Sequence, residues 1–360
     1  MNFLLSDTQR EIQDTIRRLL AQRCDSRRLH AMFDGDGAHD AALWQALAAV
    51  GALSLHLPEA HGGAGLGLLD AALIAEVLGE AAAPVPFLGH VVATTALALA
   101  GSDEQRNRWL PKLASGEAIA TVAFEEEGAR WDPAEWQLAC DGTSITGSKR
   151  SVEAAGIADV VVVGGRDGAL ALVERPAAGL EAQPLDGIDR TRRLWNLSFV
   201  RTPADALPGA TPAIAERLRD AALILVAADA FGGAARAVTQ SVEYAKTRHQ
   251  FGVPIGQFQA LKHQLAEMAV AVEPSRGLYW FAAHAWDDIP AQASAAAALA
   301  KSHLCERFLQ AARDAIEAHG GIGYTWAYDT QILLKRAMYD FAMFGIPATH
   351  RARYADLARW

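Results

Sequence analysis

The chain has 360 residues, more than one hydrophobic core usually organises, so two or three domains are expected. Its 51% hydrophobic and 21% charged residues exclude a disordered chain, and a net charge of −9 without a basic run argues against nucleic acid or anionic membrane as partners. The three cysteines lie far apart, which indicates reduced thiols. No signal peptide is visible at the N-terminus, and the most apolar stretch, Ala221–Ala230, is too short to span a membrane. These features predict a cytoplasmic protein.

Residues 1–115 carry the pattern of an all-helical domain. Ser6 and Gln9 have the spacing of a capping box, and apolar residues recur behind them at helical intervals. Further helical patterns, separated by glycine- or proline-rich breaks, cover Ala41–Val50, Leu68–Ala81 and His90–Ala100.

Residues 116–205 change to short segments of β-branched and small apolar residues, bounded by Gly or Asp, which predict a small antiparallel β domain. These segments are Ala118–Phe124, Ser144–Thr146, Val160–Gly164 and Ala169–Val173. Residues 206–360 are helical again and suit a four-helix bundle. Its expected helices are Ile214–Arg248, Gln259–Trp286, Ala291–His319 and Thr330–Phe344. The predicted fold class is therefore α+β: mainly α, with a β domain between two helical domains.

The first candidate binding motif lies where a helix is expected to end, at about Gln250, with a turn behind it. An arginine beside a turn, here Arg248, can hold a diphosphate through two parallel hydrogen bonds, and Phe251 can form a wall for a planar ring. The same residues can instead serve the helix dipole and the core, and the spacing alone favours that structural role.

The second motif is His319–Thr325, which contains Gly320, Gly321 and Gly323. Clustered glycines allow backbone amides to approach a ligand closely. No strand is predicted before the motif, so it is neither a Rossmann nor a P-loop fingerprint. Taken alone, it favours a simple helix terminator.

In combination, these features resemble the acyl-CoA dehydrogenase family. The shared pattern is Arg-x-x-Phe-Gly with Phe-Gln beyond it, then Gly-Gly-x-Gly-Tyr. Leu57–Gly65 is similar to the family's Pro-Glu-x-x-Gly-Gly-x-Gly turn, and Arg106–Glu117 to its segment leading into the β domain. The resemblance covers essentially the whole chain. It implies the three-domain fold, FAD as cofactor, an acyl-CoA substrate, usually a tetramer, and an electron-transferring flavoprotein as electron acceptor.

The resemblance also implies a flavin shared between subunits, one surrounding the ring and its neighbour contacting the diphosphate and adenine. By motif, this chain would contribute to a partner's FAD through Arg248, Phe251, Gln259, Gly320, Gly321 and Gly323. Glu317 stands where many relatives carry a glutamine that contacts the adenine half, so it is a departure on this side.

The residues that would serve this chain's own flavin ring do not match the family. Glu125 replaces a threonine that meets the flavin, Ser151 replaces a tryptophan against the ring, and Glu153 replaces a second threonine. Carboxylates near a reduced, anionic flavin are unfavourable unless they are paired or protonated.

The catalytic base is also missing. The family reaction needs a carboxylate over the α-carbon of the thioester, and Phe344 occupies its usual position. The other position known in the family falls on Ala222. Of the nearby acids, Asp220 is a weak candidate base that we expect on a solvated helix face, whereas Asp229 is expected to be a hydrogen-bonded structural acid, or else partly buried with a raised pKa.

This uneven pattern resembles the base-lacking subunits of family members that form two-plus-two heterotetramers, some of which act on steroid side-chain thioesters. Two alternatives stay open. One is a complete homotetramer with an unorthodox base such as Asp220. The other is a catalytically silent scaffold or binding homologue.

Overall fold

The computed structural model describes residues 4–140 and 143–359. Its first part is helical and contains α1 (Asp7–Arg23), α2 (Ser26–Asp34), α3 (Ala41–Ala49), α4 (Leu68–Glu80), α5 (Phe87–Ala100) and α6 (Asp103–Ala114). The predicted capping box is present, since the Ser6 hydroxyl accepts from the Gln9 amide and the Gln9 side chain accepts from the Ser6 amide. Helices α4 and α5 are buried along most of their length and pack against α7.

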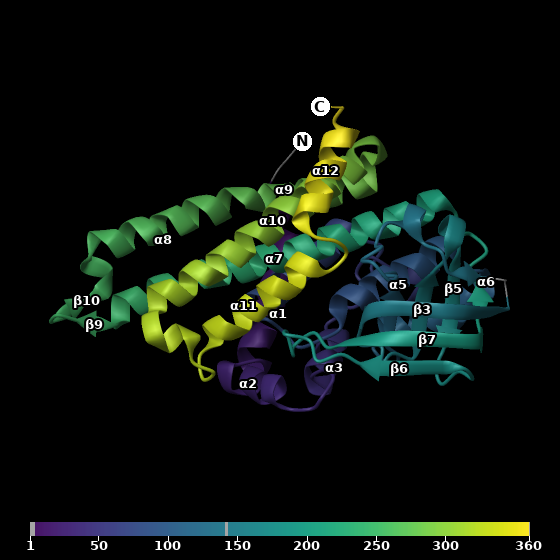
Figure 1. The fold of residues 1–360 in the computed structure, drawn as a ribbon, viewed down its shortest axis with the longest axis horizontal. Helices are drawn as coiled ribbons and strands as arrows, with labels where there is room; N and C mark the ends of the chain where they lie inside the picture. Colours follow the sequence, from purple (N-terminus) through teal and green to yellow (C-terminus); the bar gives the residue numbers. More distant parts are fainter. Residues whose placement is uncertain (1–3, 141–142, 360) are drawn as a thin grey trace.

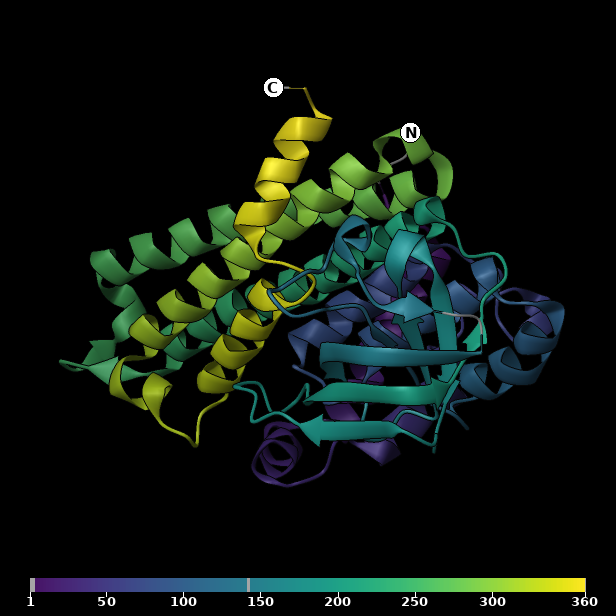
Figure 2. The ribbon, with the colours of Figure 1, turned by 45° about the vertical axis from the view of Figure 1, so that its right-hand side comes forward.

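The middle of the chain forms two small sheets. One has the order β1 (Ala120–Ala123), β4 (Val160–Gly164), β5 (Leu170–Glu174) and β8 (Asp205–Ala206). The other has the order β2 (Ala139–Cys140), β3 (Ser144–Glu153), β7 (Leu194–Pro203) and β6 (Leu180–Pro184), and Figure 2 shows its three longer strands side by side. Pairing is antiparallel except between β1 and β4, because the chain passes through the second sheet before it returns to β4.

The last part is a bundle that extends away from the sheets (Figure 1). Its helices are α7 (Pro212–Thr247), α8 (Gln259–Val272), α9 (Arg276–Asp288), α10 (Pro290–His319), α11 (Asp329–Ala342) and α12 (Pro347–Leu357). The single helix expected over Gln259–Trp286 is interrupted at Glu273–Ser275, where Pro274 has no amide to donate. A two-stranded hairpin, β9 (His249–Gln250) and β10 (Val253–Pro254), lies at the far end of the bundle.

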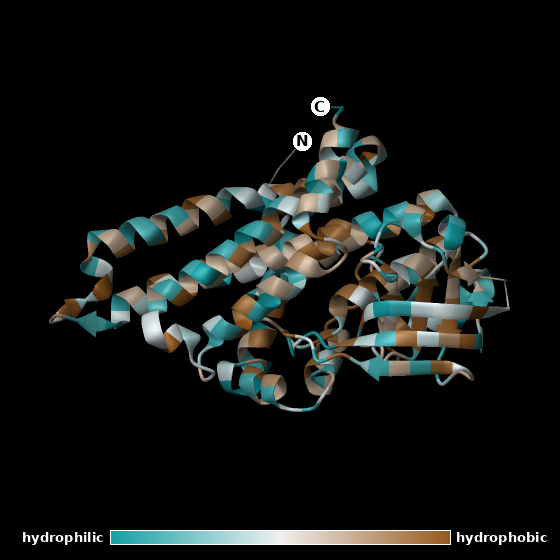
Figure 3. Cartoon of the chain, viewed as in Figure 1, coloured by the Kyte–Doolittle hydropathy of each residue, from teal (hydrophilic) through white to brown (hydrophobic). Residues whose placement is uncertain are grey.

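Helix α7 forms the core of the bundle. Among the residues that the structure describes, it is the one helix that is long and apolar enough to cross a membrane. Of its most apolar 18-residue stretch, 89% is buried inside the protein. Figure 3 shows polar residues along the outer helix α8 and strand β6, whose outward faces are exposed. The apolar surface of α7 is therefore covered by the protein itself.

The sequence patterns did not indicate α2, α6 or α12. All three have start signals that a closer inspection could use: Asp25 caps α2, Ser102 and Gln105 form a capping box at α6, and Pro347 occupies the first turn of α12. Helices end at Ala114, strands run from Ala120 to Ala206, and helices resume at Pro212. The domain boundaries at 115 and 205 stay predictions.

Candidate functional site

A cavity of about 930 Å³ opens between the β domain and the C-terminal helices. We call it the interdomain cleft. Its walls include Glu125 and Ser151 from the β domain, and Tyr339 and Phe344 from the C-terminal segment. The fold thus brings together three positions, 125, 151 and 344, at which the sequence departs from the motifs of the acyl-CoA dehydrogenase family.

The β-domain wall of the cleft is polar at these positions. Glu125 follows β1 and is half-buried; burial raises the pKa of its carboxyl, and Ser151 and Arg150 oppose that rise. Ser151 lies at an irregularity of β3 with φ of 48°, a rare conformation for a residue with a side chain. A serine here offers no aromatic surface to a planar ring.

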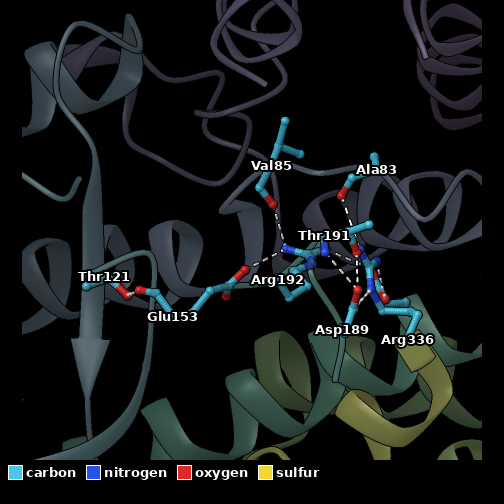
Figure 4. Close-up of polar contacts among 9 residues, drawn as sticks. Ala83, Val85, Thr121, Glu153, Asp189, Thr191, Arg192 and Arg336 are labelled. Atoms are coloured by element: carbon cyan, nitrogen blue, oxygen red, sulfur yellow. Dashed lines mark hydrogen bonds and ion pairs between the residues drawn. The ribbon is translucent and has the colours of Figure 1, made fainter. Parts of the chain in front are cut away.

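Glu153, the third departure, is tied into a buried network of charges (Figure 4). Its carboxylate accepts from the Arg192 guanidinium at 2.9 Å. Arg192 also donates to Asp229 at 2.9 Å and to the Val85 carbonyl at 2.7 Å. One guanidinium therefore links β3, helix α7 and the segment before α5.

Arg336 of α11 continues this network from the other side. It donates to Asp189 at 2.7 Å, to Asp229 at 3.1 Å and to the Ala83 carbonyl at 3.3 Å, and it also contacts the Thr191 hydroxyl. We call Glu153, Asp189, Arg192, Asp229 and Arg336 the ion cluster. All five are almost fully buried, so their charges persist only because each carboxylate faces a guanidinium.

Asp229 accepts from both arginines of the ion cluster. The expectation that it is a hydrogen-bonded structural acid is therefore confirmed. For Asp220 the expectation of a solvated helix face is wrong. Asp220 is 2% exposed and its carboxylate accepts from Arg219 at 3.2 Å, from Arg353 at 3.4 Å and from the Ser294 hydroxyl. Arg219 and Arg353 cover this carboxylate, and the helical pattern alone could not reveal that contact.

Phe344 occupies the wall of the cleft where the family places its base. Its side chain is 6% exposed and packs edge-on against Trp131, with ring centroids 5.1 Å apart. Its carbonyl accepts from His350 at 2.8 Å, and its φ is 57°. Ala222, at the alternative position for a base, is buried in α7 and has no titratable group.

A second, smaller cavity of about 450 Å³ lies near the far end of the bundle. We call it the hairpin groove. It is lined by four of the predicted cofactor residues, Arg248, Glu317, Gly320 and Gly321, which come from the ends of α7 and α10. Two sequence motifs about 70 residues apart thus converge on one surface.

The two glycines of this groove differ in backbone conformation and in the space around them. Gly320 has φ 63° and ψ −145°, a backbone region essentially restricted to glycine. Gly321 has no such constraint, and a Cβ added there would meet nothing within 4 Å. No packing within the chain therefore requires glycine at 321, which leaves close approach by a ligand as a reason for it.

The remaining predicted cofactor residues lie outside the groove lining. Phe251 is at the tip of the β9–β10 hairpin with φ of 54° and is 91% exposed, an unusual conformation for a bulky side chain. Gln259 is exposed at the first position of α8. Gly323 is buried, and a Cβ there would lie 2.8 Å from the Ile316 carbonyl oxygen, so its role within this chain is packing.

Sequence reasoning missed Arg192, Arg336 and Asp189, which complete the ion cluster. They come from a loop and from α11, and no local motif links them. Only the carboxylate at 153, unexpected beside a flavin, indicated that a buried partner was needed.

Comparisons with known proteins agree with this architecture. Residues 6–117 match the acyl-CoA dehydrogenase N-terminal domain and residues 213–356 match the acyl-CoA dehydrogenase C-terminal domain. The acyl-CoA dehydrogenase IpdE2 of Mycolicibacterium smegmatis is 33% identical over 347 residues, 95% of this chain and 96% of the relative.

Among solved structures, a variant of the steroid ACAD Tcur3481-Tcur3483 aligns with a TM-score of 0.91 and 32% identity over 98% of both chains. The ChsE4-ChsE5 complex from Mycobacterium tuberculosis aligns with a TM-score of 0.92 and 26% identity, over 100% of this chain and 99% of that one. The chain therefore belongs to the acyl-CoA dehydrogenase family, FAD-dependent oxidoreductases that act on CH–CH bonds.

Proposed function

We propose that this chain is the half-site subunit of a hetero-oligomeric acyl-CoA dehydrogenase. In this assembly a homologous partner surrounds the flavin ring and supplies the base, while this chain completes the partner's FAD site. The reaction is α,β-dehydrogenation of an acyl-CoA thioester. When bound, FAD accepts the hydride equivalent that leaves the β-carbon.

The observation that carries this proposal is the ion cluster. At position 153, where the family motif sets a threonine against the flavin, this chain has a carboxylate bonded to the buried Arg192. Releasing that arginine to admit a ring would leave a buried charge without its partner, which costs several kcal/mol. The ion cluster therefore disfavours a flavin ring against position 153.

The absence of a usable base supports the same proposal. Abstracting the α-proton needs a carboxylate within hydrogen-bonding reach of the substrate. Phe344 has none, and the carboxylate oxygens of Asp220 are engaged by two arginines and a serine. This favours a partner as the source of the base over a homotetramer that uses Asp220.

The hairpin groove, in contrast, fits the diphosphate part of FAD. Arg248 is exposed and presents a planar guanidinium suited to two phosphate oxygens. Gly321 leaves its backbone open to close approach, and the exposed Phe251 offers an apolar surface beyond the groove. We propose that Arg248 and the Gly320–Gly321 turn bind the partner's FAD, with Phe251, Gln259 and Glu317 around them.

The comparisons support a homologous partner. Two structural neighbours are named as pairs, Tcur3481-Tcur3483 and ChsE4-ChsE5, and the first is called a steroid ACAD. By this likeness we propose a thioester of a steroid side chain or fatty acid as the substrate class, and an electron-transferring flavoprotein as the acceptor.

The test is flavin content, measured on the chain purified alone and co-purified with a family member encoded beside it. We expect no flavin in the chain alone and about one FAD per unlike pair in the complex. Arg248→Ala should lower FAD retention in the complex, whereas Lys246→Ala, two residues earlier and also exposed, should not. One FAD per chain in the protein alone would overturn the half-site proposal.

A further inference from the structure

The interdomain cleft contains several polar atoms that no group in the described residues satisfies. They are Nε of Arg192, Nη2 of Arg219, the Tyr339 hydroxyl, Nδ1 of His350 and Oε2 of Glu125. All five side chains line the cleft; Glu125 is half-buried and the other four are more than nine-tenths buried. Buried polar atoms normally have a hydrogen-bond partner, so a group of five around one cavity indicates that a ligand or ordered water supplies the missing partners.

Most of the remaining wall is apolar. Side chains from both domains face the same cavity: Trp131, Ile188, Leu194, Met338, Met343 and Phe344. An apolar wall with a few converging polar atoms is the usual composition of a small-molecule site, and the cavity volume lies in the range of such sites. Water alone in the cavity would leave these apolar side chains in contact with solvent, whereas an apolar ligand would bury them.

The charges of the wall favour a neutral ligand. The lining includes five carboxylates, Glu125, Asp132, Glu135, Asp189 and Asp356, against three guanidiniums, so its formal charge is negative. The guanidiniums are already paired: Arg192 with Glu153, Arg219 with Asp132, and Arg353 with Asp220. A polyanion such as a CoA diphosphate would meet net repulsion here.

The unsatisfied atoms define what the ligand must present. Arg192 Nε and Arg219 Nη2 are donors, and the Tyr339 hydroxyl can donate. His350 Nε2 faces the Phe344 carbonyl at 2.8 Å and must carry the proton, so Nδ1 of the neutral ring is an acceptor. Oε2 of Glu125 is a second acceptor. Three donors and two acceptors match a molecule with ketone or hydroxyl oxygens on an apolar body.

We propose that the interdomain cleft, which holds no flavin in the half-site subunit, is instead a binding site for a neutral, largely apolar molecule carrying ketone or hydroxyl oxygens. Arg219 and Tyr339 bind its oxygen, and the wall around Trp131 and Phe344 covers its apolar body. This site rests on the proposed function only in requiring that FAD does not occupy the cleft.

Benzophenone is a suitable probe because it is a neutral ketone and attaches covalently to nearby C–H bonds on illumination. 4-Benzoylbenzoate is the matched anion. We expect saturable calorimetric binding of about one benzophenone per full-length chain, with at least tenfold weaker binding of the anion because of the acidic wall. Photolabel should map to Met338 and Met343, while Met32 and Met268 on α2 and α8 serve as internal controls.

Tyr339→Phe removes only the hydroxyl, which has no partner among the described residues. The variant should therefore fold with unchanged or higher resistance to urea and bind benzophenone roughly three- to tenfold more weakly. Tyr279→Phe is the matched control, since that buried hydroxyl donates to Glu76 outside the cleft. It should lose stability and keep its affinity for the ketone.

Three results would overturn the site: no saturable binding of benzophenone, equal or tighter binding of 4-benzoylbenzoate, or labelling away from α11 and the segment behind it. Flavin content is recorded on the same samples. A flavin-free chain that fails to bind the ketone disproves this site alone, whereas a chain that carries its own FAD disproves the half-site proposal first.

Discussion

The guanidinium of Arg192 and the carboxylate of Glu153 lie 2.9 Å apart with both side chains buried, and Asp229 accepts from the same guanidinium. Strand β3 is thereby bonded to the long core helix of the bundle through a single side chain. This relationship links the departure of the sequence from its family to the stability of the fold, because the carboxylate at position 153 shares its buried arginine with helix α7.

Replacing Glu153 with threonine, the residue type that the family motif carries there, should therefore destabilise this chain. The change leaves Arg192 buried with one carboxylate in place of two, and we expect a loss of about 3 kcal/mol in the free energy of unfolding in urea. The control is Glu174→Thr, which removes an ion pair with Arg108 at the surface. The loss in the free energy of unfolding of Glu174→Thr should stay below about 1 kcal/mol. Equal losses in the two variants would contradict a structural role for the ion cluster.

The two glycines of the hairpin groove should respond differently to alanine. Gly321→Ala should leave the free energy of unfolding within about 0.5 kcal/mol of the parent, because the added methyl meets open space. In the complex with the partner it should nevertheless weaken FAD retention. Gly320→Ala should cost about 1–3 kcal/mol in the chain alone, because alanine rarely adopts a φ of 63° with a ψ of −145°. Flavin fluorescence after dilution measures retention; normal retention by Gly321→Ala would argue that no ligand approaches this turn.

Much of the fold could be predicted because it depends on local patterns. The capping box at Ser6, the apolar strand Val160–Gly164 and the periodicity of α7 are each visible within a few turns or residues. The convergence of Arg248 with Gly320 was predictable only through resemblance to a family, since the spacing of either motif is equally consistent with a helix end.

The buried charges could not be predicted in the same way. Helical spacing placed Asp220 on the opposite side from Ala222 and suggested solvent, but Arg219, Ser294 and Arg353 cover it from its own helix, α10 and α12. Helix α12, which carries Arg353, was itself not predicted from the sequence. Burial of a polar residue is a property of tertiary contacts that periodicity along one helix does not encode.

Two buried histidines should make the chain sensitive to mild acid. Burial lowers the pKa of His90 to about 3 and that of His350 to about 4. Below about pH 6.5 each histidine takes up a proton in the unfolded chain but stays neutral in the folded one, so stability is complete above that pH and falls as the pH decreases toward 4. The expected loss is about 1.4 kcal/mol per pH unit for each residue.

His90→Asn tests this pH dependence directly. The amide oxygen of asparagine can accept from the Ala120 amide, as His90 Nδ1 does at 3.2 Å, but it does not titrate. Between pH 7.5 and 5.5 the variant should lose about 1 kcal/mol less stability than the parent. His249→Asn, at an exposed position of the hairpin, should follow the parent curve. Identical slopes in the parent and His90→Asn would show that other groups cause the acid sensitivity.

Neutralising Asp220 separates its structural contacts from a role as base. Asp220→Asn keeps the shape of the side chain and the contact with Ser294 but removes the charge that faces Arg219 and Arg353. We expect a loss of about 1–3 kcal/mol in the free energy of unfolding of the chain. Thioester oxidation by the reconstituted complex should stay within about twofold of the parent at a temperature where both are folded, because a base supplied by the partner is untouched.

If Asp220 were the base, Asp220→Asn would instead reduce turnover by at least about a hundredfold with little change in flavin content. The matched substitution of the partner's carboxylate should then be silent, whereas in a half-site assembly it abolishes turnover.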